Sequence, residues 1–212
     1  MNDILDTRFE GKEIEIKDNL VEVGDDINIM EKDPSLNKLL VGVGWDVNAF
    51  DADTLDMDIS VLLLDKNDQT RIDEDFIYYN NMEVLEGAVK HNGDSRTGAG
   101  DGDDETITID LHGIPFDIFK IMFVLSIYKG MEKDQTMSMV RNAYLRLTNI
   151  ETRHEILRFD LKEILENKLE TALLVGSLNR EGPKWHFTPT GEFITGDLRA
   201  VCERYGLIIG QY

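Results

Sequence analysis

Short segments in which apolar and polar residues alternate recur along most of the chain. Alternation with a period of two is typical of a β-strand with one buried face, because successive side chains point to opposite sides. The clearest case lies in residues 55–61, where Met57, Ile59 and Val61 share one face. Together with one nearly continuous apolar run at 121–128, the pattern predicts strands over residues 13–17, 39–43, 55–61, 76–79, 106–111, 121–128, 141–148, 156–161, 171–178 and 184–187.

The last apolar segment, residues 197–205, has the periodicity of a helix instead. Its apolar residues follow the spacing i, i+3, i+4, i+7: Leu198, Val201, Cys202 and Tyr205. Cys202 is then a small core residue, and a catalytic role is disfavoured because no histidine or other base stands at a recognisable spacing from it. Many short strands, turn signals between them and one terminal helix predict a mainly β protein, an antiparallel β-sandwich with a short C-terminal helix.

A chain of 212 residues, 42% of them hydrophobic, is long enough to bury a sizeable core. We expect residues 27–212 to form one sandwich domain. Residues 1–26 are expected to be an N-terminal extension that can add an edge strand. Residues 179–183 have the composition of a hairpin loop between the last two strands.

The charge balance narrows the choice of partners. The chain has 42 acidic and 22 basic residues and a net charge of -20, which disfavours nucleic acid and anionic lipid and favours cations or basic proteins. The absence of any 18-residue apolar run predicts that the chain does not insert into a membrane, and the acidic start is unlike a secretory signal. A single cysteine allows no internal disulfide, so a cytoplasmic location is expected.

The segment of residues 93–105, GDSRTGAGDGDDE, places five carboxylates among four glycines. Carboxylates this close repel one another, and a hard cation among their oxygens would offset that repulsion. Ca²⁺ takes about six to eight oxygen ligands, so one short loop leaves it incomplete and other segments must contribute. The EF-hand pattern cannot be laid over this segment with its ligands in place. The alternative interpretation is a solvated acidic turn.

Further oxygen donors stand at the ends of predicted strands. Asp46 ends one apolar strand, and Asn80 and Asn81 follow another. Asp56 and Asp58 share the face opposite the core stripe of one strand, where residues two apart are separated by roughly 6.5–7 Å and can lean onto one ion. Each of these residues alone is typical of a turn or of the wet face of a sheet. Their number beside the acidic segment favours a metal site.

The donor chemistry indicates which metal to expect. Carboxylate, amide and carbonyl oxygens favour Ca²⁺ or Mg²⁺, whereas Zn²⁺ prefers cysteines or clustered histidines. The histidines show no metal-ligand spacing along the chain: His91, His112, His154 and His186. The residues therefore predict a site for a hard divalent cation.

Taken in order, several segments resemble the TerD family of bacterial tellurium-resistance and stress proteins. The matching stretches are LVGVGWD at 40–46, LDMD at 55–58, DFIYYNN at 75–81, the 93–105 segment, FVLSIY at 123–128, VRNAY at 140–144 and ETA at 170–172. They extend over most of the chain. Several independent motifs in the same order make this resemblance more specific than one glycine-rich loop.

The resemblance implies a cytoplasmic β-sandwich that binds calcium, commonly two ions, and is not an enzyme. The partners that it implies are other Ter-type proteins and a membrane protein of the TerC type. The family's acidic calcium positions would fall on Asp46, Asp56, Asp58, Asp94, Asp101, Asp103, Asp104 and Glu105, with main-chain carbonyls from Thr97, Gly98 and Gly100. Asn80 is added to this expected ligand set from its place at a strand end. Ser95 stands where an asparagine is expected, and residues 1–26 are longer and more acidic than the family's usual N-terminal strand.

Three functions remain open from the sequence. The first, which we expect, is a calcium-dependent module that binds a protein or a small ligand. The second is a metal-dependent phosphoester hydrolase or phosphotransferase with His91 as its base. We favour the simpler interpretation of His91 as a surface residue beside a turn, because no second base or oxyanion donor is evident. The third is a metal-independent assembly protein that pairs through its strand edges.

Overall fold

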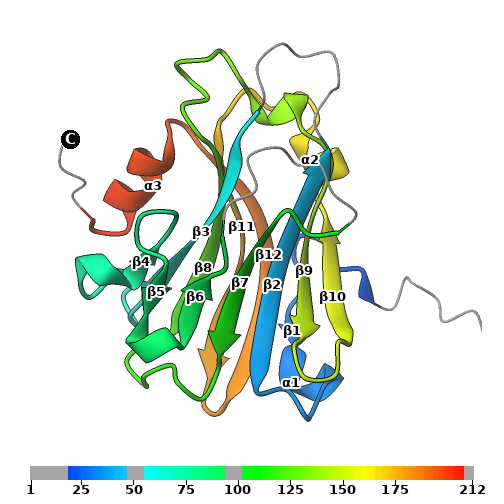
Figure 1. Ribbon diagram of the computed structural model, residues 1–212, viewed down its shortest axis with the longest axis vertical. Helices are drawn as coiled ribbons and strands as arrows, with labels where there is room; N and C mark the ends of the chain where they lie inside the picture. Colours follow the sequence, from blue (N-terminus) through cyan, green and yellow to red (C-terminus); the bar gives the residue numbers. More distant parts are fainter. Residues whose placement is uncertain (1–18, 47–54, 94–101, 208–212) are drawn as a thin grey trace, which may run out of the picture.

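Two antiparallel sheets packed face to face form the protein (Figure 1). The computed structural model describes residues 19–46, 55–93 and 102–207. Sheet A contains β2 (Lys38–Asp46), β5 (Glu83–Val84), β6 (Val89–His91), β7 (Glu105–Asp110), β9 (Arg141–Asn149) and β10 (Glu155–Asp160). Sheet B contains β1 (Ile27–Asn28), β3 (Met57–Leu64), β4 (Phe76–Ile77), β8 (Lys120–Ile127), β11 (Ala172–Glu181) and β12 (Lys184–Ile194). The predicted antiparallel β-sandwich is confirmed.

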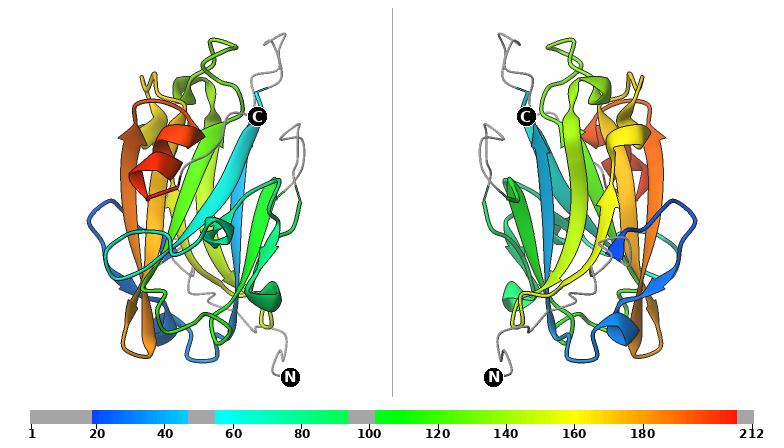
Figure 2. Two further views of the ribbon diagram at one scale, coloured as in Figure 1. Left: turned by 90° about the vertical axis from the view of Figure 1, so that its left-hand side faces the viewer. Right: turned by 90° about the vertical axis from the view of Figure 1, so that its right-hand side faces the viewer.

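The strand order gives the neighbouring strands within each sheet. Sheet A runs β10-β9-β2-β7-β6-β5, and sheet B runs β1-β12-β11-β8-β3-β4. The helices are α1 (Ile29–Lys32), α2 (Lys162–Leu165) and α3 (Leu198–Arg204), and single 3₁₀ turns stand at η2 (Asp73–Asp75), η3 (Leu85–Gly87) and η4 (Met137–Met139). The C-terminal helix α3 lies on the outer face of sheet B (Figure 2).

The main core lies between the sheets and is built from the alternating residues of each strand. On β3, Met57 and Ile59 are fully buried in this core. The opposite face of β3 carries Leu62 and Leu64, which pack under α3 against Cys202. Cys202 is thus a core residue as predicted, and its burial raises the pKa of the thiol to about 12.

The predicted strands differ from the observed ones mainly at their ends. The strand expected over 76–79 is only two residues long, because Tyr78 and Asn81 exchange backbone hydrogen bonds of 3.1 and 2.9 Å and turn the chain. The loop expected over 179–183 is tighter, since β11 continues to Glu181 and β12 begins at Lys184. The pattern did not indicate β1, β5 or β6, which are two or three residues long.

The N-terminal segment is described only from residue 19. The expected strand over 13–17 lies outside the described residues. Leu20 forms an isolated parallel bridge to Arg158 of β10, and the neighbouring Val21 is buried. Among the described residues, no helix is long and apolar enough to cross a membrane.

Candidate metal centre

The described carboxylates of the expected ligand set gather where β2 ends and where β3 and β7 begin. β2 and β7 are antiparallel neighbours that place Val43 opposite Glu105. The Trp45 N–H of β2 donates a hydrogen bond of 2.8 Å to Asp104 Oδ2. Five members of the predicted set lie outside the described residues: Asp94, Thr97, Gly98, Gly100 and Asp101.

Glu105 connects the two sheets at this end. Its Oε2 accepts a hydrogen bond of 2.7 Å from the Ile59 N–H of β3, on the strand edge that β4 leaves uncovered. The side chain is 1% exposed. Because Ile59 is the residue after Asp58, this bond brings the start of β7 next to the segment of β3 that carries Asp58.

The pKa of the Asp104 carboxyl is raised in this arrangement. Burial raises the pKa of the Asp104 carboxyl most, and the neighbouring carboxylates Asp46 and Asp103 raise it further, against the lowering effect of the Trp45 N–H. Asp46 is exposed at the end of β2 and accepts a hydrogen bond of 2.6 Å from Asn142. Asp46 and Asp103 therefore lie within electrostatic reach of Asp104, and like charges accumulate there.

Asp103 forms an ion pair with Arg146, a residue that the sequence analysis did not single out. Arg146 of β9 donates from Nε to Asp103 Oδ1 at 2.8 Å and from Nη2 to Oδ2 at 3.0 Å. The Tyr144 hydroxyl lies 3.1 Å from Asp103 Oδ1 and 3.0 Å from the Gly102 carbonyl. Only 7% of the Asp103 side chain is exposed. Both oxygens of this carboxylate are engaged, so Asp103 fastens the chain before β7 onto sheet A.

Two glycines of β2 make room for this attachment. A Cβ at Gly42 would overlap the Asp103 carboxylate, and a Cβ at Gly44 would meet the Tyr144 hydroxyl at 2.5 Å. The Gly-x-Gly spacing places both glycines on the same face of the strand. The alternation of β9 in the sequence indicates that Tyr144 and Arg146 point away from the core. It does not indicate that both side chains contact Asp103.

His91 occupies a different environment from the one predicted. It is 1% exposed at the end of β6, so its interpretation as a surface residue is wrong. Its Nδ1 accepts a hydrogen bond of 3.2 Å from the Gly93 N–H, and its Nε2 lies 3.7 Å from Glu105 Oε2. The imidazole is therefore enclosed next to the Glu105 carboxylate.

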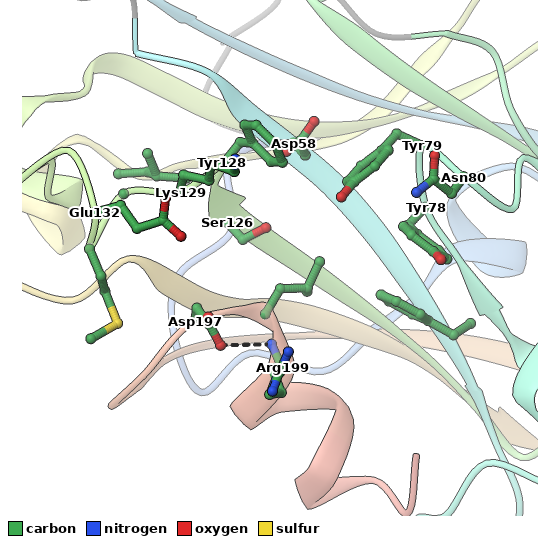
Figure 3. A pocket seen from close by; sticks show the side chains of 15 residues that line it. Asp58, Tyr78, Tyr79, Asn80, Ser126, Tyr128, Lys129, Glu132, Asp197 and Arg199 are labelled. Carbon is green, nitrogen blue, oxygen red and sulfur yellow. Dashed lines mark hydrogen bonds between the residues drawn. The ribbon is translucent and has the colours of Figure 1, made fainter. Parts of the chain in front are cut away.

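Asp58 opens onto a pocket on the outer face of sheet B (Figure 3). This pocket has a volume of about 400 Å³ and is lined by Asp58, Tyr79, Asn80, Ser126 and Tyr128, with Lys129 and Arg199 among its other lining residues. Asp58 is 6% exposed and Asn80 is exposed. The placement of Asp58 on the face opposite the core stripe is confirmed.

The rings of Tyr79 and Tyr128 shape the pocket wall. They meet edge to face with their centroids 5.9 Å apart. Burial raises the pKa of the Tyr79 hydroxyl most, followed by Tyr128 and Asp58, and Asp56 adds a smaller contribution. Asp56 and Asp58 therefore both lie within electrostatic reach of Tyr79. Sequence reasoning did not anticipate this pocket, because its lining comes from separate parts of the chain.

The donors present fit a hard divalent cation. Asp46, Asp58, Asp104 and Glu105 supply only carboxylate oxygens, which are the ligands of Ca²⁺ and Mg²⁺. Asp58 and Glu105 are buried, and the pKa of Asp104 is raised mainly by burial and further by the neighbouring Asp46 and Asp103. A bound cation would offset the repulsion between these carboxylates.

The fold and the site define this protein as an antiparallel β-sandwich with carboxylates at one end of the sheets. The TerD domain family matches residues 19–205, so the chain belongs to that family. Tellurium resistance protein TerD of Serratia marcescens is 40% identical over 184 residues, which cover 87% of this chain and 95% of that protein. General stress protein 16U of Bacillus subtilis (strain 168) is 39% identical over 188 residues, covering 88% and 96%.

A solved structure shares the fold. The crystal structure of a homologue of telluride resistance protein (TerD) from Streptomyces coelicolor A3(2) matches with a TM-score of 0.63 at 20% identity, over 78% of this chain and 96% of that one. The predicted resemblance to the TerD family is confirmed. The chain is a member of a tellurium-resistance and stress-response family.

Proposed function

We propose that this TerD-family protein is a calcium-binding, non-enzymatic module of the stress response that binds its partner in a calcium-dependent way. The observation that carries the proposal is the pair of backbone hydrogen bonds that hold Asp104 on β2 and Glu105 on β3. These bonds bring carboxylates to the end of β2 and to the start of β3. Among the described residues no three of these carboxylates come within 4.8 Å of one another, so the proposed site also needs the donors within 94–101. Such a gathering costs free energy without a counterion and provides a ligand set with one.

The proposed ligands have different roles. Asp46, Asp56, Asp58, Asp104 and Glu105 supply carboxylate oxygens at the described strand ends, and Asn80 supplies an amide oxygen. The predicted donors within 94–101 complete the set, which we propose to hold two ions. Asp103, with both oxygens on Arg146, positions the adjacent chain instead of binding metal.

The pocket beside Asp58 is the proposed docking site for the partner. Bound calcium would neutralise Asp58 at its wall, leaving Lys129, Arg199 and the faces of Tyr79 and Tyr128 to contact a ligand. Other Ter-type proteins and a TerC-like membrane protein are the proposed partners, and the cytoplasm is the proposed location. Neither direct nucleic-acid binding nor membrane insertion is part of this proposal.

Isothermal titration of chelator-treated protein with CaCl₂ and, separately, MgCl₂ tests this function. We expect a saturable heat with Ca²⁺ and a stoichiometry of about two, with weaker binding of Mg²⁺. Asp58→Asn should weaken binding at least tenfold, because it removes one charged oxygen ligand. The exposed Asp73→Asn in η2 is the matched control and should leave the affinity unchanged.

The same titration separates the alternatives. Tighter binding of Mg²⁺ than of Ca²⁺ would favour phosphoryl-transfer chemistry over a calcium module. No heat with either ion would contradict metal binding and favour the assembly function.

Asp104→Asn is expected to stabilise the metal-free protein at pH 7. The raised pKa of Asp104 means that the folded state binds this proton more tightly than the unfolded chain does. The stability that this group contributes is present below its unfolded pKa and is lost as the pH rises through its folded pKa. An asparagine retains an oxygen for the Trp45 N–H without the charge, so in chelator its Tm should exceed that of the parent at pH 7.

Melting curves in chelator between pH 3.5 and 8 measure this effect. The difference between Asp104→Asn and the parent should shrink toward low pH, where Asp104 is protonated. With excess Ca²⁺ the order should reverse, because the parent binds the ion more tightly. A parent that is the more stable protein in chelator at pH 7 would contradict the proposed electrostatic cost.

A further inference from the structure

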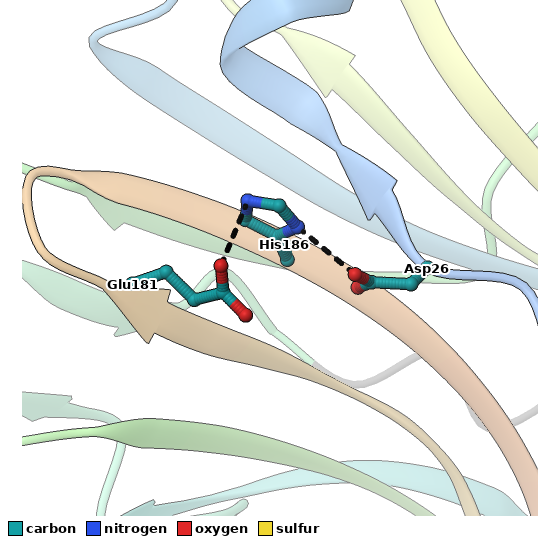
Figure 4. A group of neighbouring side chains, drawn as sticks. All are labelled: Asp26, Glu181 and His186. Atoms are coloured by element: carbon teal, nitrogen blue, oxygen red, sulfur yellow. Dashed lines mark hydrogen bonds and ion pairs between the residues drawn. The ribbon is translucent and has the colours of Figure 1, made fainter.

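A second group of metal-binding side chains lies on sheet B, around His186 of β12 (Figure 4). Asp26 approaches from the segment before β1, and Glu181 ends β11 at the hairpin. One ligand atom from each of the three lies within 4.8 Å of the others. Figure 1 shows this hairpin at the opposite end of the sandwich from the end of β2, so the group is separate from the carboxylates described above.

The two ring nitrogens of His186 face different carboxylates. Nδ1 lies 3.2 Å from Asp26 Oδ2, and Nε2 lies 3.6 Å from Glu181 Oε2. The Thr188 hydroxyl donates to Asp26 Oδ1 at 3.5 Å, which helps to orient that carboxylate. The His186 side chain is 15% exposed, whereas those of Asp26 and Glu181 are 58% and 65% exposed. The imidazole is therefore held in place while Glu181 is able to adjust.

We propose that His186 Nε2 and Glu181 bind a transition-metal dication of the Zn²⁺ class, with Asp26 holding the imidazole through Nδ1. A carboxylate that accepts the second ring N–H of a ligating histidine fixes its tautomer and makes it a stronger donor. Zinc bonds of about 2.0–2.2 Å at a tetrahedral angle place nitrogen and oxygen about 3.4 Å apart. The 3.6 Å gap between Nε2 and Glu181 Oε2 is close to that spacing.

The histidine distinguishes this site from an acidic surface that attracts any cation. An imidazole nitrogen favours Zn²⁺, Cu²⁺ or Ni²⁺ over Ca²⁺ and Mg²⁺. With few protein ligands, water occupies the remaining positions, and we expect a dissociation constant in the micromolar range or weaker.

The site also has a structural consequence. Asp26 precedes β1, and β1 pairs with β12 through Asn28 opposite His186. A metal bound here clasps the segment before β1 to the β11–β12 hairpin. Zn²⁺ should then raise the Tm of the protein and slow hydrogen exchange at Ile27 and Asn28.

Titration of Ca²⁺-saturated protein with ZnCl₂ at pH 7.5 tests the proposal, because calcium occupies the acidic end and leaves this site open. Saturable binding of about one Zn²⁺ is expected, and His186→Ala should weaken it at least tenfold. Glu181→Gln and Asp26→Asn should each weaken it roughly 10- to 100-fold. The exposed His112→Ala is the matched control and should bind as the parent does.

Co²⁺ gives a second readout that does not depend on heats of binding. Its visible absorption should appear on the parent and be lost in Glu181→Gln, a substitution at an exposed side chain that leaves the fold intact. Equal zinc affinity in the parent, His186→Ala and Glu181→Gln would overturn the site. The absence of saturable binding below 1 mM Zn²⁺ would overturn it as well.

Discussion

Calcium is expected to raise the Tm of the chelator-treated protein by roughly 5–10 °C. A ligand at about 100 times its dissociation constant stabilises the folded state by about 2.7 kcal/mol. In a domain of this size, each kcal/mol shifts Tm by roughly 2–4 °C. The physical reason is that backbone hydrogen bonds hold Asp104 on β2 and Glu105 on β3 in the folded state, whereas these carboxylates are dispersed in the unfolded chain. Thermal unfolding in chelator and in excess CaCl₂, followed by circular dichroism, measures the shift.

Three comparisons make this result specific to the proposed centre. Asp58→Asn should lose most of the shift, whereas the exposed Asp73→Asn should retain it. Mg²⁺ at the same concentration should produce a smaller shift, since it accepts fewer protein ligands and keeps its waters. Identical Tm values with and without Ca²⁺ would rule out a folded-state calcium site.

Arg146→Ala is expected to reduce the free energy of unfolding by about 2–3 kcal/mol. The substitution leaves the Asp103 carboxylate, 7% exposed, without its bidentate partner. Removing one member of a buried ion pair costs about 3–5 kcal/mol, and the partial exposure of Arg146 reduces the expected loss below that range. Urea denaturation in chelator measures it. In calcium titrations the same variant should bind about tenfold more weakly, because Asp104 and Glu105 follow the anchor directly.

Arg158→Ala is the matched control for this substitution. Arg158 stacks on the Tyr144 ring at 4.0 Å, and its ion pair is with Glu155. Its loss should be below about 1 kcal/mol. The double variant Arg146→Ala/Asp103→Ala should recover part of the stability lost in Arg146→Ala, since the unpaired carboxylate is removed. Equal losses of unfolding free energy in Arg146→Ala and Arg158→Ala would contradict the stabilising role of the ion pair between Arg146 and Asp103.

The long strands could be predicted because burial of one face imposes a period of two. β7 and β9 were each recognised from alternation, and β8 from a continuous apolar run that reflects burial on both faces. β3 was recognised from the alternation at its start, although it too is buried on both faces. The short strands β1, β5 and β6 were missed because two or three positions cannot display a period. The early end of β4 depends on backbone hydrogen bonds between Tyr78 and Asn81, which leave no hydrophobic signature.

The candidate site could be predicted in its residue types but not in its pairings. Clustered carboxylates and glycines favour a hard cation, although a solvated acidic turn has the same composition, so the metal site at the acidic segment stays a prediction. The partners of those carboxylates lie far away along the chain: Arg146 stands 43 residues from Asp103, and Ile59 stands 46 residues from Glu105. No local pattern encodes such distances.

The sandwich class and the family could be predicted from the amino-acid sequence alone, because periodicity and motif order are visible along the chain; the calcium chemistry of the acidic segment stays a prediction. Only the tertiary structure decided that Asp103 is an anchor on Arg146, that His91 is buried against Glu105, and that His186 meets Asp26, 160 residues away. These contacts follow from strand order and register, which bring distant segments together when the two sheets close on their core.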